Sequence, residues 1–167
     1  MSMKNRWIAL YVENEVGVLA KVAGLFAGKS YNLHSLTVGT TEDETMSRMT
    51  IGVTSDDTTF EQIKKQLNRM VEVIKVMDLT DTPTHMKEIL YVKVFNLKPE
   101  EKTEVFQIAQ VFCVDVVDIG ADSVLLECKL TERKNNELVK LLKTRFKRIN
   151  VVRGGAVAIE SISTKCR

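Results

Sequence analysis

The sequence predicts an α+β chain built from two similar small modules. Short runs of β-branched, aromatic and aliphatic residues alternate with segments whose apolar residues recur at helical spacing, in the order β-α-β-β-α-β. The same order returns in the second half of the chain. Residues 81–84, which are polar and contain one of the two prolines, are the only plausible linker between the halves. This order is the ferredoxin-like plan. We therefore expect two ferredoxin-like βαββαβ modules, over residues 1–80 and 86–163.

In the first module, β-branched and aromatic content predicts four strands, over residues 7–12, 31–38, 48–53 and 71–79. The first helix is expected from Gly17, because the apolar residues that follow it lie on one helical face. Gly28 can end that helix, since glycine accepts a positive φ at little cost. The segment Thr58-Thr59-Phe60-Glu61 has the pattern of a capping box and predicts the start of the second helix there.

The second module repeats this order, with strands expected over residues 89–95, 112–119, 123–130 and 148–162. Pro99 stands where a helix can begin, since its fixed φ suits the first helical turn. Thr131 can cap the second helix of the module. We expect Gly154-Gly155 to interrupt the last strand.

Composition limits the possible classes of function. The chain has 167 residues, of which 44% are hydrophobic and 28% charged, as in globular proteins. Its net charge of +2 is too small to indicate nucleic-acid binding. There is no signal-peptide pattern and no uncharged run of about 18 residues, so we expect no membrane span. Three cysteines without CxxC spacing indicate a reduced, cytoplasmic protein with neither a disulfide framework nor a zinc site.

The most informative stretch covers residues 12–20, where a strand ends in a polar turn and Gly17 then opens a helix. The free N–H groups and the dipole of a helix N-terminus both favour negative charge. Asn14 lies three residues before the glycine and can bond either end of an amino acid. The stretch therefore suits the carboxylate of a small ligand. It contains no catalytic nucleophile or base, and the chain has no P-loop, GxGxxG motif, metal-ligand set or triad. We therefore predict no catalytic, cofactor-binding or metal-binding residues.

Other polar groups are expected to have ordinary structural roles. Glu42-Asp43-Glu44 is read as a solvated hairpin tip, because no further carboxylate at ligand spacing would complete a cation site. Cys113 and Cys128 are expected to be small buried groups in strands, and Cys166 an exposed tail residue. Two histidines lack a catalytic partner pattern, namely His34 and His85. The basic cluster over residues 143–148 is read as a solvated face, with partner docking as the alternative.

The first module resembles an ACT domain, the small-molecule-sensing module of amino-acid metabolism. A closer resemblance, to the small subunit of acetolactate synthase, covers nearly all of residues 6–95 and is looser beyond. It is carried by the motifs Val12-Glu13-Asn14, Gly17-Val18-Leu19, Gly24-Leu25-Phe26, Tyr31-Asn32-Leu33, Leu36-Thr37-Val38-Gly39, Thr41-Glu42-Asp43, Ser47-Arg48-Met49-Thr50-Ile51, Glu61-Gln62-Ile63 and Lys87-Glu88-Ile89-Leu90. The Val152-Arg153-Gly154-Gly155 ending is compatible with it.

This resemblance implies a regulatory subunit that is not itself an enzyme. In that family the catalytic large subunit, a thiamine-diphosphate-dependent transferase, carries thiamine diphosphate, FAD and magnesium. The small subunit activates it and confers feedback inhibition by branched-chain amino acids, usually valine. ACT modules form homodimers and bind effectors at the pair interface. By carry-over, the valine site would combine residues of one chain with residues of its partner, namely Asn14, Gly17, Val18 and Leu19 with Asn32 and Leu33.

The sequence departs from the family pattern at two places. Many relatives have proline before the glycine, where this chain has Val16, and proline would stiffen the turn. Many relatives also carry an arginine pair and a glycine before the Tyr-Asn, where this chain has Gly28-Lys29-Ser30. The first departure bears on effector affinity, and the second on cationic surface that would meet the large subunit.

Two other functions compete with this interpretation. One is a free-standing amino-acid sensor that regulates transcription or another enzyme, since fold does not fix function. It would need a DNA-reading element, and the sequence shows neither a helix-turn-helix pattern nor a concentrated basic face. The other is a small enzyme on the ferredoxin-like scaffold, which would need a perturbed acid or base in a pocket.

Overall fold

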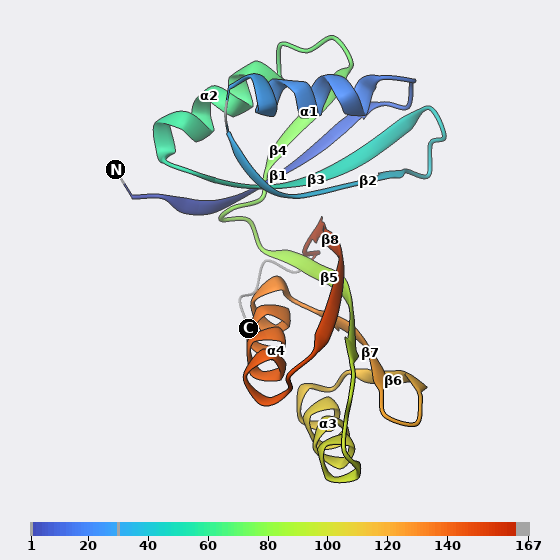
Figure 1. Cartoon of the computed structure of the whole chain (residues 1–167). Coiled ribbons are helices and arrows are strands. Elements are labelled where there is room, and N and C mark those ends of the chain that lie inside the picture. The colour runs from blue at the N-terminus through green and yellow to red at the C-terminus, as the bar shows by residue number, and fades with distance from the viewer. Residues whose placement is uncertain (1, 30, 163–167) are drawn as a thin grey trace. The chain divides into compact units, whose positions relative to one another are not determined.

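The computed structural model of the chain describes residues 2–29 and 31–162 (Figure 1). Cys166, expected to be exposed, lies outside the described residues. The chain divides into two compact units. The first comprises Met1–His85 together with Ala156–Arg167, and the second Met86–Gly155. Each unit is a four-stranded sheet with helices, which confirms the two predicted ferredoxin-like modules.

The sheet of the first unit has the strand order β2-β3-β1-β4, with neighbouring strands antiparallel. Its strands are β1 (Lys4–Glu13), β2 (Asn32–Thr40), β3 (Met46–Ser55) and β4 (Val73–Asp78). Helices α1 (Val18–Gly28) and α2 (Asp57–Leu67) cover one face of this sheet (Figure 1). The other face is called the outer face below.

The apolar periodicity of the sequence produces this arrangement. Along β1, Ile8, Leu10 and Val12 are fully buried, because alternate residues of a strand point to the same face. In α1, Val18, Val22 and Phe26 recur every four residues and are buried against that face. The core of the first unit therefore lies between the sheet and its two helices.

The second unit repeats the plan with the order β6-β7-β5-β8. The elements of this plan are β5 (Thr84–Val94), α3 (Pro99–Phe112), β6 (Asp115–Ile119), β7 (Val124–Leu130), α4 (Glu132–Arg145) and β8 (Ile149–Glu160). The first two residues of β5 and the last five of β8 belong to the first unit. Pro99 begins α3, and the Thr131 side chain accepts a hydrogen bond from the N–H of Lys134 at the start of α4, as expected for a proline start and a threonine cap.

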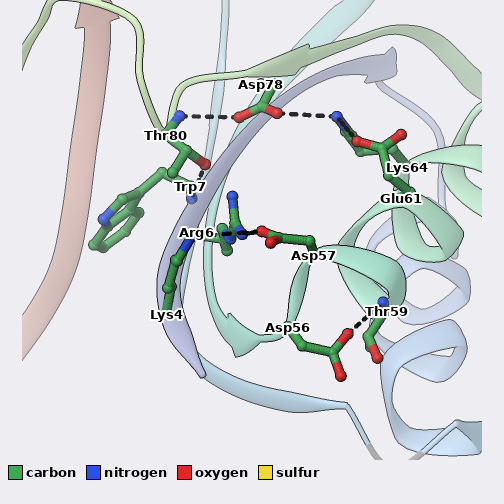
Figure 2. A network of polar contacts seen from close by, with 10 residues as sticks. All are labelled: Lys4, Arg6, Trp7, Asp56, Asp57, Thr59, Glu61, Lys64, Asp78 and Thr80. Carbon is green, nitrogen blue, oxygen red and sulfur yellow. Dashed lines mark hydrogen bonds and ion pairs between the residues drawn. The ribbon is translucent and has the colours of Figure 1, made fainter. Parts of the chain in front are cut away.

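Three local predictions were wrong. Helix α2 begins at Asp57, not at a Thr58–Glu61 capping box, because the Asp56 carboxylate caps it by accepting the Thr59 N–H at 2.7 Å (Figure 2). Residue 112 ends α3 rather than starting a strand, and Cys113 is its exposed left-handed C-cap with φ of 54°. Finally, β8 runs through Gly154 and Gly155 without interruption, with Gly155 at a φ of 84°.

A network of charges ties the start of β1 to α2 and β4 (Figure 2). The buried Arg6 side chain pairs with Asp57 and lies over the Phe60 ring at 5.1 Å. Lys64 bonds Glu61 at 2.7 Å within α2 and Asp78 at 3.0 Å at the end of β4. These contacts hold α2 against β1 and β4, so we assign them a structural role.

Candidate functional site

The turn that was expected to open the first helix does so through Gly17. This residue is the N-cap of α1, with φ of 91° and ψ of −11°. Side chains rarely adopt that left-handed conformation, whereas glycine does so at little cost. A Cβ atom on Gly17 would meet nothing within 4 Å. Backbone conformation, not crowding, is therefore what requires glycine here, and the space beside the turn is open.

The N-terminus of α1 differs from those of α2 and α4, because among the described residues no side chain caps it. The Lys21 N–H already bonds the Gly17 carbonyl at 3.0 Å, and the Val18 N–H approaches the Glu15 carbonyl at 3.4 Å. The first turn contains no acidic residue. The start of α1 thus offers N–H groups and a dipole to an anion, as the sequence suggested.

Asn14 lies before this turn and is engaged by the β2–β3 hairpin. Its Nδ2 donates to the Glu44 carbonyl at 2.8 Å, and its Oδ1 accepts the Ser47 hydroxyl at 2.9 Å. Its backbone N–H also bonds the Thr45 carbonyl at 2.8 Å. Asn14 therefore holds the hairpin in place, and the remaining N–H and lone pair of its amide are what it can offer to a ligand.

The surface around Asn14 is acidic. A shallow hollow there is lined by Glu13, Asn14, Glu15, Glu44, Thr45, Met46 and Ile74. Nearby, Lys21 of α1 pairs with Glu72, whose hydrogen bond raises the pKa of the lysine and lowers that of the carboxyl. Carboxylates on this side favour an ammonium group, while the start of α1 favours a carboxylate. Together the two sides match the charges of a free amino acid.

The three apolar residues of the predicted site have different environments. Val18 is 3% exposed and belongs to the core, whereas Leu19 is 43% exposed. Of the pair, Leu19 is therefore the one whose side chain a ligand can reach. The side chain of Leu33 is half-buried and packs against the core of the first unit.

Asn32 lies at the opposite end of the sheet from Asn14. Asn32 pairs with Thr54 near the end of β3, while Asn14 bonds Thr45 immediately before β3 begins. Nine residues of strand at about 3.3 Å each separate these points, which gives roughly 30 Å. A single chain therefore does not bring Asn14 and Gly17 together with Asn32 and Leu33.

Comparison with known proteins agrees with this architecture. A family model described as the AHAS small subunit-like ACT domain matches residues 8–75, and one described as the small subunit of acetolactate synthase matches residues 87–162. The acetolactate synthase small subunit of Aquifex aeolicus is 41% identical over 152 residues, which are 91% of this chain and 79% of that protein. The chain belongs to the acetolactate synthase small-subunit family.

Other members of the family support the assignment over the whole chain. The acetolactate synthase small subunit of Haemophilus influenzae is 34% identical over 92% of this chain and 94% of its own length. The crystal structure of the small subunit from Thermotoga maritima superposes with a TM-score of 0.84 at 32% identity, covering 96% of this chain and 99% of that one. The predicted role as a non-catalytic regulatory subunit, whose partner is a catalytic large subunit, is confirmed at this level.

Within the part of the chain that the structure describes, no group of three or more His, Cys, Asp or Glu side chains is arranged to hold a metal ion, and no helix is long and apolar enough to cross a membrane. At the hairpin tip, the Asp43 carboxylate accepts bonds from the Thr45 N–H and hydroxyl, which lower its pKa.

Sequence reasoning missed three residues near the candidate site. Ser47 orients Asn14, and Lys21 with Glu72 forms a charged pair beside the start of α1. Ser47 stands in the quoted Ser-Arg-Met-Thr motif, so a signal was present. The Lys21–Glu72 pair joins residues 51 positions apart and has no local signal.

Proposed function

We propose that valine, or another branched-chain amino acid, binds to a homodimer of this subunit. The subunit activates acetolactate synthase, and the bound amino acid feedback-inhibits the enzyme. The observation that carries the proposal is the uncapped, glycine-opened N-terminus of α1 beside an acidic hollow. The ligand carboxylate would accept N–H groups of α1, and its ammonium group would face Asn14 and the neighbouring carboxylates. Its aliphatic side chain would contact Leu19.

The second half of the site would come from a partner chain through β2. This strand is an edge of its sheet, and its sequence contains no proline and no Lys, Arg, Asp or Glu. Edge strands of stable monomers usually carry such residues, which hinder pairing with another chain. The other edge, β4, contains Lys75 and Asp78. The composition of β2 favours pairing with a second copy.

Antiparallel pairing of two β2 strands would complete the site. A two-fold axis near the middle of β2 would place the partner's Asn32 beside Thr40. Thr40 pairs with Ser47, which donates to Asn14. The partner's Asn32 and Leu33 would then lie at the same end of the sheet as Gly17. Asn32 of the same chain lies roughly 30 Å from Asn14, whereas the partner's Asn32 would lie beside the site in the dimer.

The wider functional assignment follows the family. Residues 1–80 would form the ACT regulatory domain and residues 86–163 the C-terminal domain, in a cytoplasmic complex. The partner large subunit would carry thiamine diphosphate, FAD and magnesium. Each relative named above is called an acetolactate synthase small subunit, which favours this role over a free-standing sensor.

The test is an activity titration. The chain is added to its cognate large subunit, and acetolactate formation is followed with and without valine, leucine or isoleucine. We expect addition of the chain to raise the rate, and valine to lower it again. An increase in rate without any response to the three amino acids would refute the effector but keep the regulatory role. Sedimentation analysis of the chain alone tests the homodimer.

A further inference from the structure

The last residues of β8 belong to the first unit and lie against the outer face of its sheet. This segment, Ala156–Glu160, is called the C-terminal strap below. Its start is bonded to β2. The Ala156 N–H donates to the Ser35 hydroxyl at 3.2 Å, and the Thr37 hydroxyl donates to the Ala156 carbonyl at 2.7 Å. Two successive outward-facing hydroxyls of β2 thus hold one residue of the strap.

Arg48 of β3 holds the other end of the strap. Its Nη2 donates to the Ala158 carbonyl at 3.0 Å and to the Glu160 carboxylate at 3.1 Å. Its Nη1 donates to the Tyr11 hydroxyl, and the guanidinium lies over the Tyr11 ring at 5.1 Å. The Arg48 side chain is only 18% exposed, so this ion pair is partly shielded from water. Such charge-assisted bonds are stronger than bonds between neutral groups.

The strap is bonded to the same strand that would pair in the dimer. Ser35 and Thr37 lie in the middle of β2, whose first residue is Asn32. Arg48 pairs across the sheet with Gly39 of β2 and with Tyr11 of β1. A change in the twist or register of β2 would therefore shift the strap, because short hydrogen bonds connect the two.

We propose that Arg48 is a positioning residue that couples effector binding at the ACT dimer to the C-terminal strap, and thereby to regulation of the large subunit. The inference rests on the proposed function, since it takes valine as the effector. The strap is the end of β8, whose first seven residues, Ile149–Gly155, belong to the second unit. Because the docked strap and the start of β8 are parts of one strand, a change in β2 that moves the strap can be passed along the backbone of β8 to the second unit.

The test separates binding from response. Arg48→Met removes the cation and keeps a side chain of similar reach over Tyr11. Lys64→Met is the matched control, because Lys64 is 21% exposed, bonds two carboxylates and stacks on the Phe60 ring, but does so on α2. Glu160→Gln weakens the strap contact while leaving Arg48 in place. For each protein, calorimetry gives the valine Kd of the free subunit, and acetolactate formation with the large subunit gives the half-inhibitory valine concentration.

For Arg48→Met we expect a valine Kd near that of wild type and a half-inhibitory concentration at least about 5-fold higher, the lower end of typical allosteric coupling. Glu160→Gln should shift the same quantity in the same direction by less, and Lys64→Met should leave it unchanged. Amide hydrogen exchange of residues 156–160 should be faster in Arg48→Met, which reports release of the strap.

Several results would overturn the assignment. Full valine inhibition in Arg48→Met would show that Arg48 does not transmit the signal. Parallel loss of valine binding and inhibition would show that it acts on the effector site itself. If Arg48→Met does not fold, unchanged inhibition in Glu160→Gln decides against the assignment. A wild-type chain that binds no valine would instead refute the proposed effector, and this inference with it.

Discussion

Replacing Gly17 by aspartate tests the effector site most directly, because it puts a carboxylate where the ligand's own would lie. The structure adds a complication, since Gly17 has a φ of 91°. A side chain in that region costs about 1–2 kcal/mol of folding free energy, less for Asp and Asn. Gly17→Asn is therefore the matched control, because it carries nearly the same backbone strain without the charge.

The repulsion between the introduced carboxylate and the ligand carboxylate has a lower and an upper estimate. Two unit charges 4 Å apart repel by about 1 kcal/mol in water and about 4 kcal/mol near a protein surface. Since about 1.4 kcal/mol is a factor of ten, Gly17→Asp should weaken valine binding by roughly 5-fold to 1000-fold relative to Gly17→Asn.

The assay is thermal unfolding with and without valine. Valine at one hundred times its Kd should stabilise the folded wild-type protein by about 2.7 kcal/mol. For a chain of this size that raises Tm by roughly 5–11 °C. Gly17→Asn should keep most of the rise. At the same valine concentration, Gly17→Asp should keep about 1.8 kcal/mol of stabilisation after a 5-fold weakening and almost none after a 1000-fold weakening. Equal rises in both variants would refute the placement of the ligand carboxylate at the start of α1.

Three further predictions follow from the site and its scaffold. Asn32→Ala should weaken valine binding by about 1 kcal/mol, roughly 5-fold, without changing the mass of the dimer, as calorimetry and sedimentation can check; unaltered affinity would remove Asn32 from the site. Asp56→Ala should lower the free energy of unfolding by about 1 kcal/mol at pH 7 in urea titrations. The hydrogen bond from the Thr59 N–H lowers the pKa of Asp56, so this stability is present above the ordinary carboxyl pKa and is lost as the pH falls through the lowered value; a difference between variant and wild type that did not shrink as the carboxyl became protonated would contradict the cap. Burial raises the pKa of the Cys128 thiol to about 11, so under native conditions at pH 8 a thiol reagent should label the exposed Cys113 and spare Cys128; peptide mass spectrometry checks this, and rapid native labelling of Cys128 would show that it is not enclosed.

Much of the fold could be predicted from the sequence because each element buries an apolar face. The i, i+4 spacing of Val18, Val22 and Phe26 defines α1, and alternation along β1 defines its buried face. Local chemistry was less reliable at helix ends. Asp56 and Thr58 are both residue types that can cap a helix. Asp56 is the N-cap of α2, because its carboxylate accepts the Thr59 N–H. At the end of α3, Cys113 has a left-handed φ that its sequence neighbours do not indicate.

The candidate site divides in the same way. Gly17 and the open helix N-terminus follow from local sequence, because backbone conformation and the helix dipole are local properties. The environment of the site does not. Glu44 and Ser47 reach Asn14 from 30 and 33 residues away. The choice between Val18 and Leu19 as a surface residue also depended on where the sheet lies beneath α1.

The sequence by itself determined the order of elements, the repeat of two modules, the glycine-opened helix and the family. The order and the repeat follow from apolar periodicity, and the helix start and the family follow from local motifs. Only the tertiary structure decided that Asn32 lies too far from Gly17 to share a site within one chain, and that Arg48 bonds the C-terminal strap. Both depend on strand pairing and on contacts between residues far apart in the chain, up to 112 positions for Arg48 and Glu160. Such contacts are fixed when the apolar faces pack together, and no local pattern encodes them.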